Sequence, residues 1–139
     1  MRTEKLFEMA DSFVDYFEKH SKIRISKDFL REYYIFSNSV FISVVEFIKW
    51  LNIRRDTMVT KITDKYTEFD DYYLTTMEDE KKHVKLYDLS ELTFKPNQIF
   101  IKITSNCFKD ICVLSSSEKG ILVRLYYKKL DQMFQTFIL

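Results

Sequence analysis

Glycine and proline are almost absent from this chain of 139 residues, which contains one of each, Gly120 and Pro96. Loops that cradle phosphates in nucleotide-dependent enzymes need several glycines, because the backbone must come close to the ligand. The sequence therefore excludes P-loop and dinucleotide-binding sites, and it predicts no cofactor. Alanine is equally rare while Lys, Ile, Tyr, Phe and Asp abound, which indicates an AT-rich genome.

Cysteine and histidine are also scarce, with two of each. Cys107 and Cys112 are five residues apart on a predicted short helix, so we expect free thiols in a reducing compartment. His20 and His83 are far apart in the sequence, and neither sits in a zinc-binding pattern, so no metal site is predicted. The chain has no apolar run of 18 residues and no signal peptide, which excludes a membrane span and predicts an intracellular protein.

The composition suits one domain over residues 1–139, because 46% of the residues are hydrophobic and 17% are aromatic. Its 22 Lys and Arg residues nearly balance its 21 Asp and Glu residues, so any basic surface must be local. We predict an α+β fold that is mainly α. Its parts are an amphipathic helix (1–20), a helical part with a helix-turn-helix (27–70), a β-ribbon with a long insert (71–104) and C-terminal helices (105–139).

Residues 44–66 carry the strongest functional signal. An apolar stripe at helical spacing consists of Val44, Val45, Ile48 and Leu51. Asn52 follows this stripe, and asparagine tolerates the left-handed backbone that can end one helix before the next begins. The buried stripe of the next helix is expected at Met58, Ile62 and Tyr66. This order predicts a helix-turn-helix, in which the second helix has a polar face left over for DNA.

The DNA-binding face is expected to be basic. The residues predicted to contact DNA from the helix-turn-helix are Arg54, Arg55, Thr57, Lys61 and Lys65. Four nearby carboxylates oppose them, because they repel phosphates: Asp56, Asp64, Asp70 and Asp71. The single tryptophan, Trp50, is expected to pack in the core rather than to stack on bases. Residues 27–35 are predicted to form a short helix before this unit.

Two segments, residues 71–76 and 99–104, alternate and are rich in aromatic and β-branched residues, so they predict an antiparallel ribbon. Such a ribbon beside a helix-turn-helix gives a winged arrangement. The first half of the insert between the strands is expected to be a solvated excursion, and its second half to pack through Leu89, Leu92 and Phe94. Expected wing-tip contacts to DNA are Lys81, Lys82, His83 and Lys85, although a solvated charge run is the simpler interpretation.

A long amphipathic helix is predicted to start after Ser117, and Ser105 or Asn106 is expected to cap the shorter helix before it. Apolar residues of the long helix step by four and three positions, which is a heptad seam. The flanking residues widen this seam, so we expect the helix to pack on its own domain and to make a second contact, either with a second copy or with a further domain of a longer protein. The predicted homodimer interface consists of Val123, Tyr127, Leu130, Phe134 and Phe137.

The order FIKWLNIRRDTMVTKI, DDYYL, IFIKIT, NCFKDIC and VRLYYKKLDQMF resembles the MSV-type domain of insect poxviruses and iridoviruses. That domain is the N-terminal module of Bro-like and KilA-N-associated viral proteins, and it is distantly similar to phage antirepressors. The resemblance covers about residues 28–134. The matching residues are Trp50, Leu51, Arg54, Arg55, Lys61, Cys107, Phe108, Lys109, Arg124 and Tyr126 or Tyr127. It implies DNA binding or gene regulation in an infected host cell.

Two functions follow from these patterns. The first is a non-catalytic viral module that binds double-stranded DNA or regulates genes. The alternative is a protein-interaction or dimerisation module that binds a host or viral regulator without touching DNA. An enzyme is not expected, because neither the acidic run at Glu78, Asp79 and Glu80 nor Cys107 is accompanied by a base or an oxyanion loop.

Overall fold

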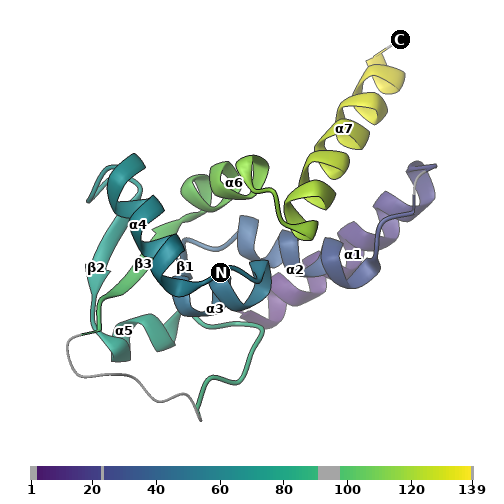
Figure 1. The fold of residues 1–139 in the computed structure, drawn as a ribbon. Coiled ribbons are helices and arrows are strands. Elements are labelled where there is room, and N and C mark those ends of the chain that lie inside the picture. The colour runs from purple at the N-terminus through teal and green to yellow at the C-terminus, as the bar shows by residue number, and fades with distance from the viewer. Residues whose placement is uncertain (1–2, 23, 91–97, 139) are drawn as a thin grey trace.

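The computed structural model describes residues 3–22, 24–90 and 98–138, with the side chains of the last helix described as far as Gln135. The helices in these ranges are α1 (Thr3–His20), α2 (Lys27–Ser37), α3 (Val44–Leu51), α4 (Arg55–Lys65), α5 (Met77–Lys82), α6 (Ser105–Leu114) and α7 (Glu118–Ile138). The strands are β1 (Phe41–Ser43), β2 (Tyr72–Thr75) and β3 (Phe100–Thr104). The fold is α+β and mainly α, which confirms the predicted class (Figure 1).

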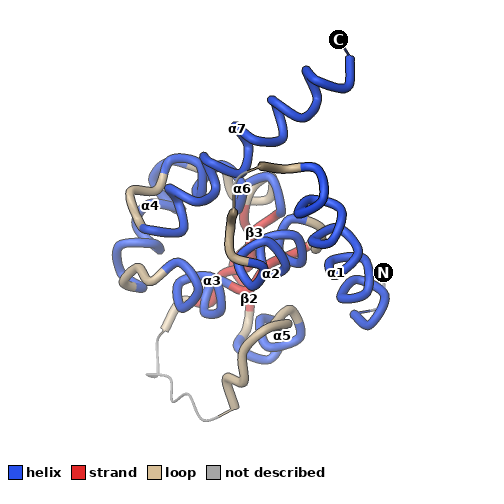
Figure 2. Tube along the Cα trace, turned by 90° about the vertical axis from the view of Figure 1, so that its right-hand side faces the viewer, coloured by secondary structure: helices blue, strands red, loops and turns tan. Residues whose placement is uncertain are grey.

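The sheet is small and antiparallel, with β3 in the middle and the strand order β1-β3-β2. The predicted ribbon is the β2–β3 pair, in which Tyr72 faces Ile103 and Thr75 faces Phe100. Strand β1 was not predicted, because three residues are too few to show alternation. Figure 2 shows the strands in the middle of the molecule, surrounded by helices, with α5 on the side away from α6.

Each strand runs directly into a helix whose first turn is capped by a hydroxyl side chain. Ser43 Oγ accepts from the Glu46 amide (3.3 Å), Thr76 Oγ1 from the Asp79 amide (3.1 Å) and Thr104 Oγ1 from the Cys107 amide (3.2 Å). Such caps stabilise a helix end by about 1 kcal/mol. The expected cap of α6 at Ser105 or Asn106 is wrong by one residue, because Thr104 has the extended backbone that a cap requires.

The core lies between the sheet and helices α2, α3 and α6. Its centre is aromatic, with the Phe108 ring 5.1 Å from Phe47, 5.3 Å from Phe36 and 5.8 Å from Trp50. Trp50 is 1% exposed, as predicted for a packing residue. On the strands, Ile42, Tyr72, Ile101 and Ile103 complete this core.

The insert between β2 and β3 is not the solvated excursion that its charges suggest. Residues 77–82 form α5, which packs on β3 through an ion pair of 2.9 Å between Asp79 and Lys102. Leu89 is buried as predicted, whereas Leu92 and Phe94 lie outside the described residues. In the described part of the chain, no helix is long and apolar enough to cross a membrane.

Helix α7 packs on its own chain through the first half of the predicted dimer seam. Val123 is fully buried in the core, so it is not available to a second copy. The Tyr127 hydroxyl shares a hydrogen bond of 2.6 Å with the Tyr33 hydroxyl, and Leu130 also packs against the core. Phe134 is 62% exposed on the part of α7 that projects from the molecule (Figure 1), and the side chain of Phe137 is not described.

The only glycine in the chain lies where α6 and α7 meet. A Cβ atom at Gly120 would overlap the carbonyl oxygen of Ser115 and lie 2.9 Å from the Ser115 Cβ. The same carbonyl oxygen accepts from Arg124 Nη1 (2.6 Å), which fixes its position. Gly120 is therefore required for the close approach of α7 to the end of α6.

We expect Gly120→Ala to destabilise the chain by about 1–3 kcal/mol, because the overlap outweighs the gain of about 1 kcal/mol in helix propensity. Chemical denaturation followed by circular dichroism measures the change. The matched control is Lys128→Ala on the exposed side of the same helix, which should stay within about 0.5 kcal/mol of the parent. A stabilised Gly120→Ala protein would contradict the described junction.

Candidate nucleic-acid interface

Helices α3 and α4 form a helix-turn-helix with a turn of three residues, 52–54. Asn52 adopts the predicted left-handed backbone (φ 59°, ψ 51°), and its amide donates to Ile48 O, which closes α3. Helix α4 then packs on the core through Met58 and Ile62, both fully buried. At its far end, the Tyr66 hydroxyl donates to Asp110 Oδ2 (2.5 Å) on α6, so both ends of α4 are fixed to the domain.

The outward face of α4 carries most of the predicted DNA contacts. Arg54, Thr57 and Lys65 are exposed, and Lys61 is half-buried, with its neighbours Met58 and Ile62 turned inward. Arg54 is the N-cap residue, and no side chain caps the α4 amides. Uncapped amides at a helix N-terminus attract phosphate oxygens, because they are free donors at the positive end of the helix dipole.

Arg55 does not belong to this face, although the sequence predicted it there. Its guanidinium donates to the carbonyl of Ile99 and lies 5.5 Å from the centre of the Phe100 ring. Burial lowers the pKa of Arg55, while the nearby carboxylates of Glu80 and Asp56 act in the opposite direction. Arg55 therefore links the start of α4 to the start of β3, and its side chain is half-buried.

Of the four predicted wing-tip residues, two are exposed and two are half-buried. Lys81 and Lys82 are exposed in the last turn of α5. Lys85 is turned inward, where its ammonium group donates to His83 O (2.9 Å) and Phe41 O (3.3 Å), and burial lowers its pKa. His83 is half-buried and faces Asp79 at 3.7 Å, with a pKa that burial lowers. Lys85 and His83 thus make contacts within the domain, and neither presents its side chain as openly as Lys81 and Lys82 do.

Of the four aspartates expected to repel phosphates, one bonds to the backbone and three are exposed. Asp71 Oδ2 accepts from the Thr67 amide (2.9 Å), so this carboxylate holds the turn before β2. Asp56 and Asp64 remain exposed on α4, and Asp70 is exposed in the turn. Arg54, Lys61 and Lys65 therefore outnumber the two carboxylates of α4 by one, so the face is only weakly positive.

Two buried glutamates hold the helix-turn-helix in place, and the roles of both were missed in the sequence. Glu80 Oε1, on α5, accepts from the Val45 amide (2.8 Å) and the Ser43 hydroxyl (3.1 Å) at the start of α3. Glu46, on α3, accepts in return from the amides of residues 85, 86 and 87 at 2.7–3.0 Å. Both side chains are at most 2% exposed. Each segment therefore caps the other.

One local signal for α5 was present. Thr76 and Asp79 have the spacing of a capping box, in which a hydroxyl side chain precedes an acidic residue by three positions. The Asp79 amide does donate to Thr76 Oγ1 in the structure, and the Asp79 carboxylate accepts from Thr75 Oγ1 (2.7 Å). The charge run concealed this signal, because five of the six residues of α5 are charged, which is typical of a solvated segment.

The groups with metal-binding or nucleophilic chemistry in the described residues are few. No group of three or more His, Cys, Asp or Glu side chains there could hold a metal ion. Cys107 and Cys112 are both buried, unpaired thiols on α6, as predicted. Burial raises the pKa of Cys107 to about 12, so this thiol is a poor nucleophile near neutral pH.

Comparisons of the chain with protein-family models, with curated proteins and with solved structures found no match.

The buried carboxyl group of Glu80 makes stability depend on pH. Burial raises its pKa above the ordinary value of 4.5, and its Oε2 has no hydrogen-bond partner among the described residues. Because the pKa of Glu80 is higher in the folded chain than in the unfolded chain, its neutral carboxyl group contributes fully to stability below pH 4.5. This contribution is lost as the pH rises through the folded-state pKa. Glu80→Gln keeps an acceptor and has no charge, so we expect its stability relative to the parent to increase with pH in this range.

Glu80→Ala tests the cap itself. We expect it to lose about 2 kcal/mol of unfolding free energy, because the Val45 amide and the Ser43 hydroxyl are left buried without an acceptor. Urea denaturation of the parent, Glu80→Gln and Glu80→Ala at several pH values measures both effects. A difference between parent and Glu80→Gln that does not change with pH would contradict a raised pKa.

Proposed function

We propose that this chain is a non-catalytic module that binds double-stranded DNA through α4 and serves in gene regulation. The observation that carries the proposal is the exposed, uncapped start of α4, with Arg54, Lys61 and Lys65 on the side away from the core. A helix held in this way by a preceding helix and a short turn is how helix-turn-helix proteins present side chains to the major groove.

The weak positive charge of α4 sets the expected affinity. If Arg54, Lys61 and Lys65 each neutralise one phosphate, the logarithm of affinity falls with the logarithm of salt with a slope of about −2.7, or about −0.9 per contact. Three contacts give modest affinity, so binding should be measurable at low salt and weak at physiological salt. Lys81 and Lys82 add to this number only where the DNA also reaches α5.

The residues to mutate are Arg54 and Lys65, because both are exposed and neither bonds to another part of the described chain. Arg55 is unsuitable, since reversing its charge would place a carboxylate near Glu80 and detach α4 from β3. We expect Arg54→Glu with Lys65→Glu to weaken binding to a labelled AT-rich duplex at least tenfold. Fluorescence anisotropy at several salt concentrations should also show the slope fall to about −0.9.

The matched control is Lys5→Glu with Lys128→Glu, which changes the net charge equally at exposed positions of α1 and α7. This control should keep most of the affinity. Equal losses in both double variants would mean that only net charge matters. Absence of binding by the parent at low salt would remove the proposal.

The viral part of the proposal has a different basis. Regulation of genes in an infected cell is implied by the resemblance of residues 28–134 to the MSV-type domain, and α4 by itself has no bearing on it. A duplex-binding module from an AT-rich genome is consistent with that role.

A protein-interaction module is the second candidate, and Phe69 favours it. This side chain is 69% exposed and has a left-handed backbone (φ 70°), which costs about 1–2 kcal/mol for a residue with a Cβ atom. Its ring meets Tyr73 at 6.0 Å, and the Tyr73 hydroxyl donates to Phe69 O (2.8 Å). An exposed aromatic residue held in a strained turn is a suitable anchor for a host or viral regulatory protein.

Self-association is the simplest form of this second function, and of the described seam only Phe134 is left largely exposed for it. A homodimer through the end of α7 should show twice the chain mass of 16.9 kDa in light scattering at high concentration. Phe134→Ser should return it to the monomer without loss of helix content. A monomer at every concentration would remove the homodimer from the proposal.

A further inference from the structure

A second basic surface lies far from α4, between the connection of α1 to α2 and the helix α7. It consists of two adjoining cavities of about 540 Å³ and 430 Å³, which share Ser21 and Lys22 in their lining. Figure 1 places α4 beside β2 at one end of the molecule and this connection at the other end, next to α7. We call the two cavities together the α1–α7 groove.

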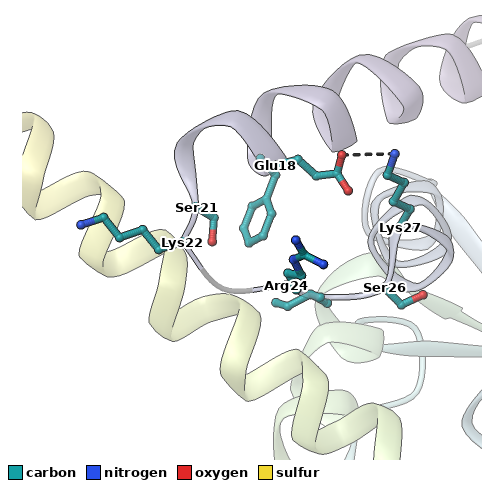
Figure 3. A pocket seen from close by; sticks show the side chains of 8 residues that line it. Glu18, Ser21, Lys22, Arg24, Ser26 and Lys27 are labelled. Atoms are coloured by element: carbon teal, nitrogen blue, oxygen red, sulfur yellow. Dashed lines mark ion pairs between the residues drawn. The ribbon is translucent and has the colours of Figure 1, made fainter.

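Basic side chains outnumber acidic ones in the lining of the α1–α7 groove. Lys22, Arg24 and Lys27 line the first cavity, and Lys22 and Lys129 line the second. In Figure 3, Arg24 points into the first cavity, whereas Lys22 extends toward α7. Neither of these two side chains makes an ion pair with a described residue. Their charges are therefore available to an anion.

Carboxylates are few in the groove and lie at one border. Glu18 is the one carboxylate in the lining of the first cavity, and Lys27 Nζ already binds it at 3.3 Å (Figure 3). The lining of the second cavity has none. Beyond Lys27, the surface turns acidic, with Asp11, Asp15 and Asp28 around a separate cleft. The positive groove thus ends at Lys27 and extends from there toward α7.

The rim of the second cavity has an exposed aromatic face. Tyr16 is 56% exposed, and its ring stacks on His20 with 4.1 Å between the ring centres. His20 Nδ1 hydrogen-bonds to the Tyr16 carbonyl at 2.9 Å, so the pair is held in place at the end of α1. A fixed, exposed ring beside a row of cations is what proteins use to stack a nucleobase next to its phosphate.

We propose that the α1–α7 groove binds single-stranded nucleic acid, with Lys22, Arg24 and Lys129 at the phosphates and Tyr16 against a base. A strand fits better than one small anion, because the cations extend over two adjoining cavities rather than converging on one point. A strand also fits better than a duplex, because cavities of this size admit a ligand of a few hundred Å³. This activity is separate from duplex binding by α4.

The test uses the full chain and a fluorescent ten-nucleotide oligo-dT, with binding followed by anisotropy at several salt concentrations. Three phosphate contacts predict a log–log slope of about −2, or about −0.7 per contact for a single strand. We expect Lys22→Glu with Arg24→Glu to weaken binding by about tenfold or more. The matched control, Lys5→Glu with Lys128→Glu, should keep the parent affinity.

The α4 variant makes the two proposals distinguishable. Arg54→Glu with Lys65→Glu should bind oligo-dT as the parent does, while Lys22→Glu with Arg24→Glu should bind duplex as the parent does. Loss of both ligands in either double variant would overturn a separate groove. Full competition by inorganic phosphate at the same concentration of phosphate groups would also overturn it, because the site would then hold a single anion.

Substitution of Tyr16 tests base stacking separately from the phosphate contacts, because it leaves the charge of the groove unchanged. Tyr16→Ala should lose about tenfold in oligo-dT affinity with an unchanged salt slope, because stacking is lost and the phosphate contacts remain. Tyr16→Phe keeps the ring and should bind as the parent does. Equal affinity of Tyr16→Ala and the parent would remove the base from the proposal, and no binding of oligo-dT by the parent at low salt would remove the groove.

Discussion

The arrangement of this fold depends on an exchange between two buried carboxylates. Glu80 accepts hydrogen bonds at the start of α3, and Glu46, in the first turn of α3, accepts from three successive amides of the segment after α5. These hydrogen bonds provide acceptors for buried amides that would otherwise have none, so the two segments stabilise each other. The connection between β2 and β3 is thereby made part of the same unit as α3, through contacts that span 35 to 41 positions of the sequence.

This exchange determines where α4 lies. Helix α3 is anchored at its first turn by Glu80, Asn52 then reverses the chain, and Arg55 anchors the start of α4 to the strand that follows the same connection. Both helices of the helix-turn-helix thus bond to described residues between β2 and β3, α3 to Glu80 and residues 85–87, and α4 to Ile99. The outward direction of Arg54 and Lys65 depends on these contacts as much as on α4 itself. A rigid support of this kind is what a recognition surface needs, because orientation is lost when either anchor moves.

Local signals explain what the sequence could predict. The stripes of α1, α3 and α7, the left-handed Asn52 and the β2–β3 pair were all visible, because each depends on spacing or on one residue's backbone preference. The site was only partly visible: the sequence defined the exposed side of α4 but could not show that Arg55 turns back to Ile99, 44 positions away. Lys85 and Val123 were misplaced for the same reason. Their surroundings come from distant segments, and no pattern near them differs from that of an exposed lysine or a coiled-coil residue.

Trp50 stands where three helices meet. Its indole Nε1–H donates to Glu32 on α2 (2.9 Å), its ring stacks on Phe29 at 5.9 Å, and the ammonium group of Lys119 on α7 lies 4.7 Å from the ring centre. Because it is the single tryptophan of the chain, all indole emission comes from this one junction. The wavelength of maximum emission therefore depends on the polarity of the surroundings that α2, α3 and α7 provide together. The fluorescence of Trp50 therefore reports whether these helices are assembled, from a core position that belongs neither to the exposed side of α4 nor to the lining of the α1–α7 groove.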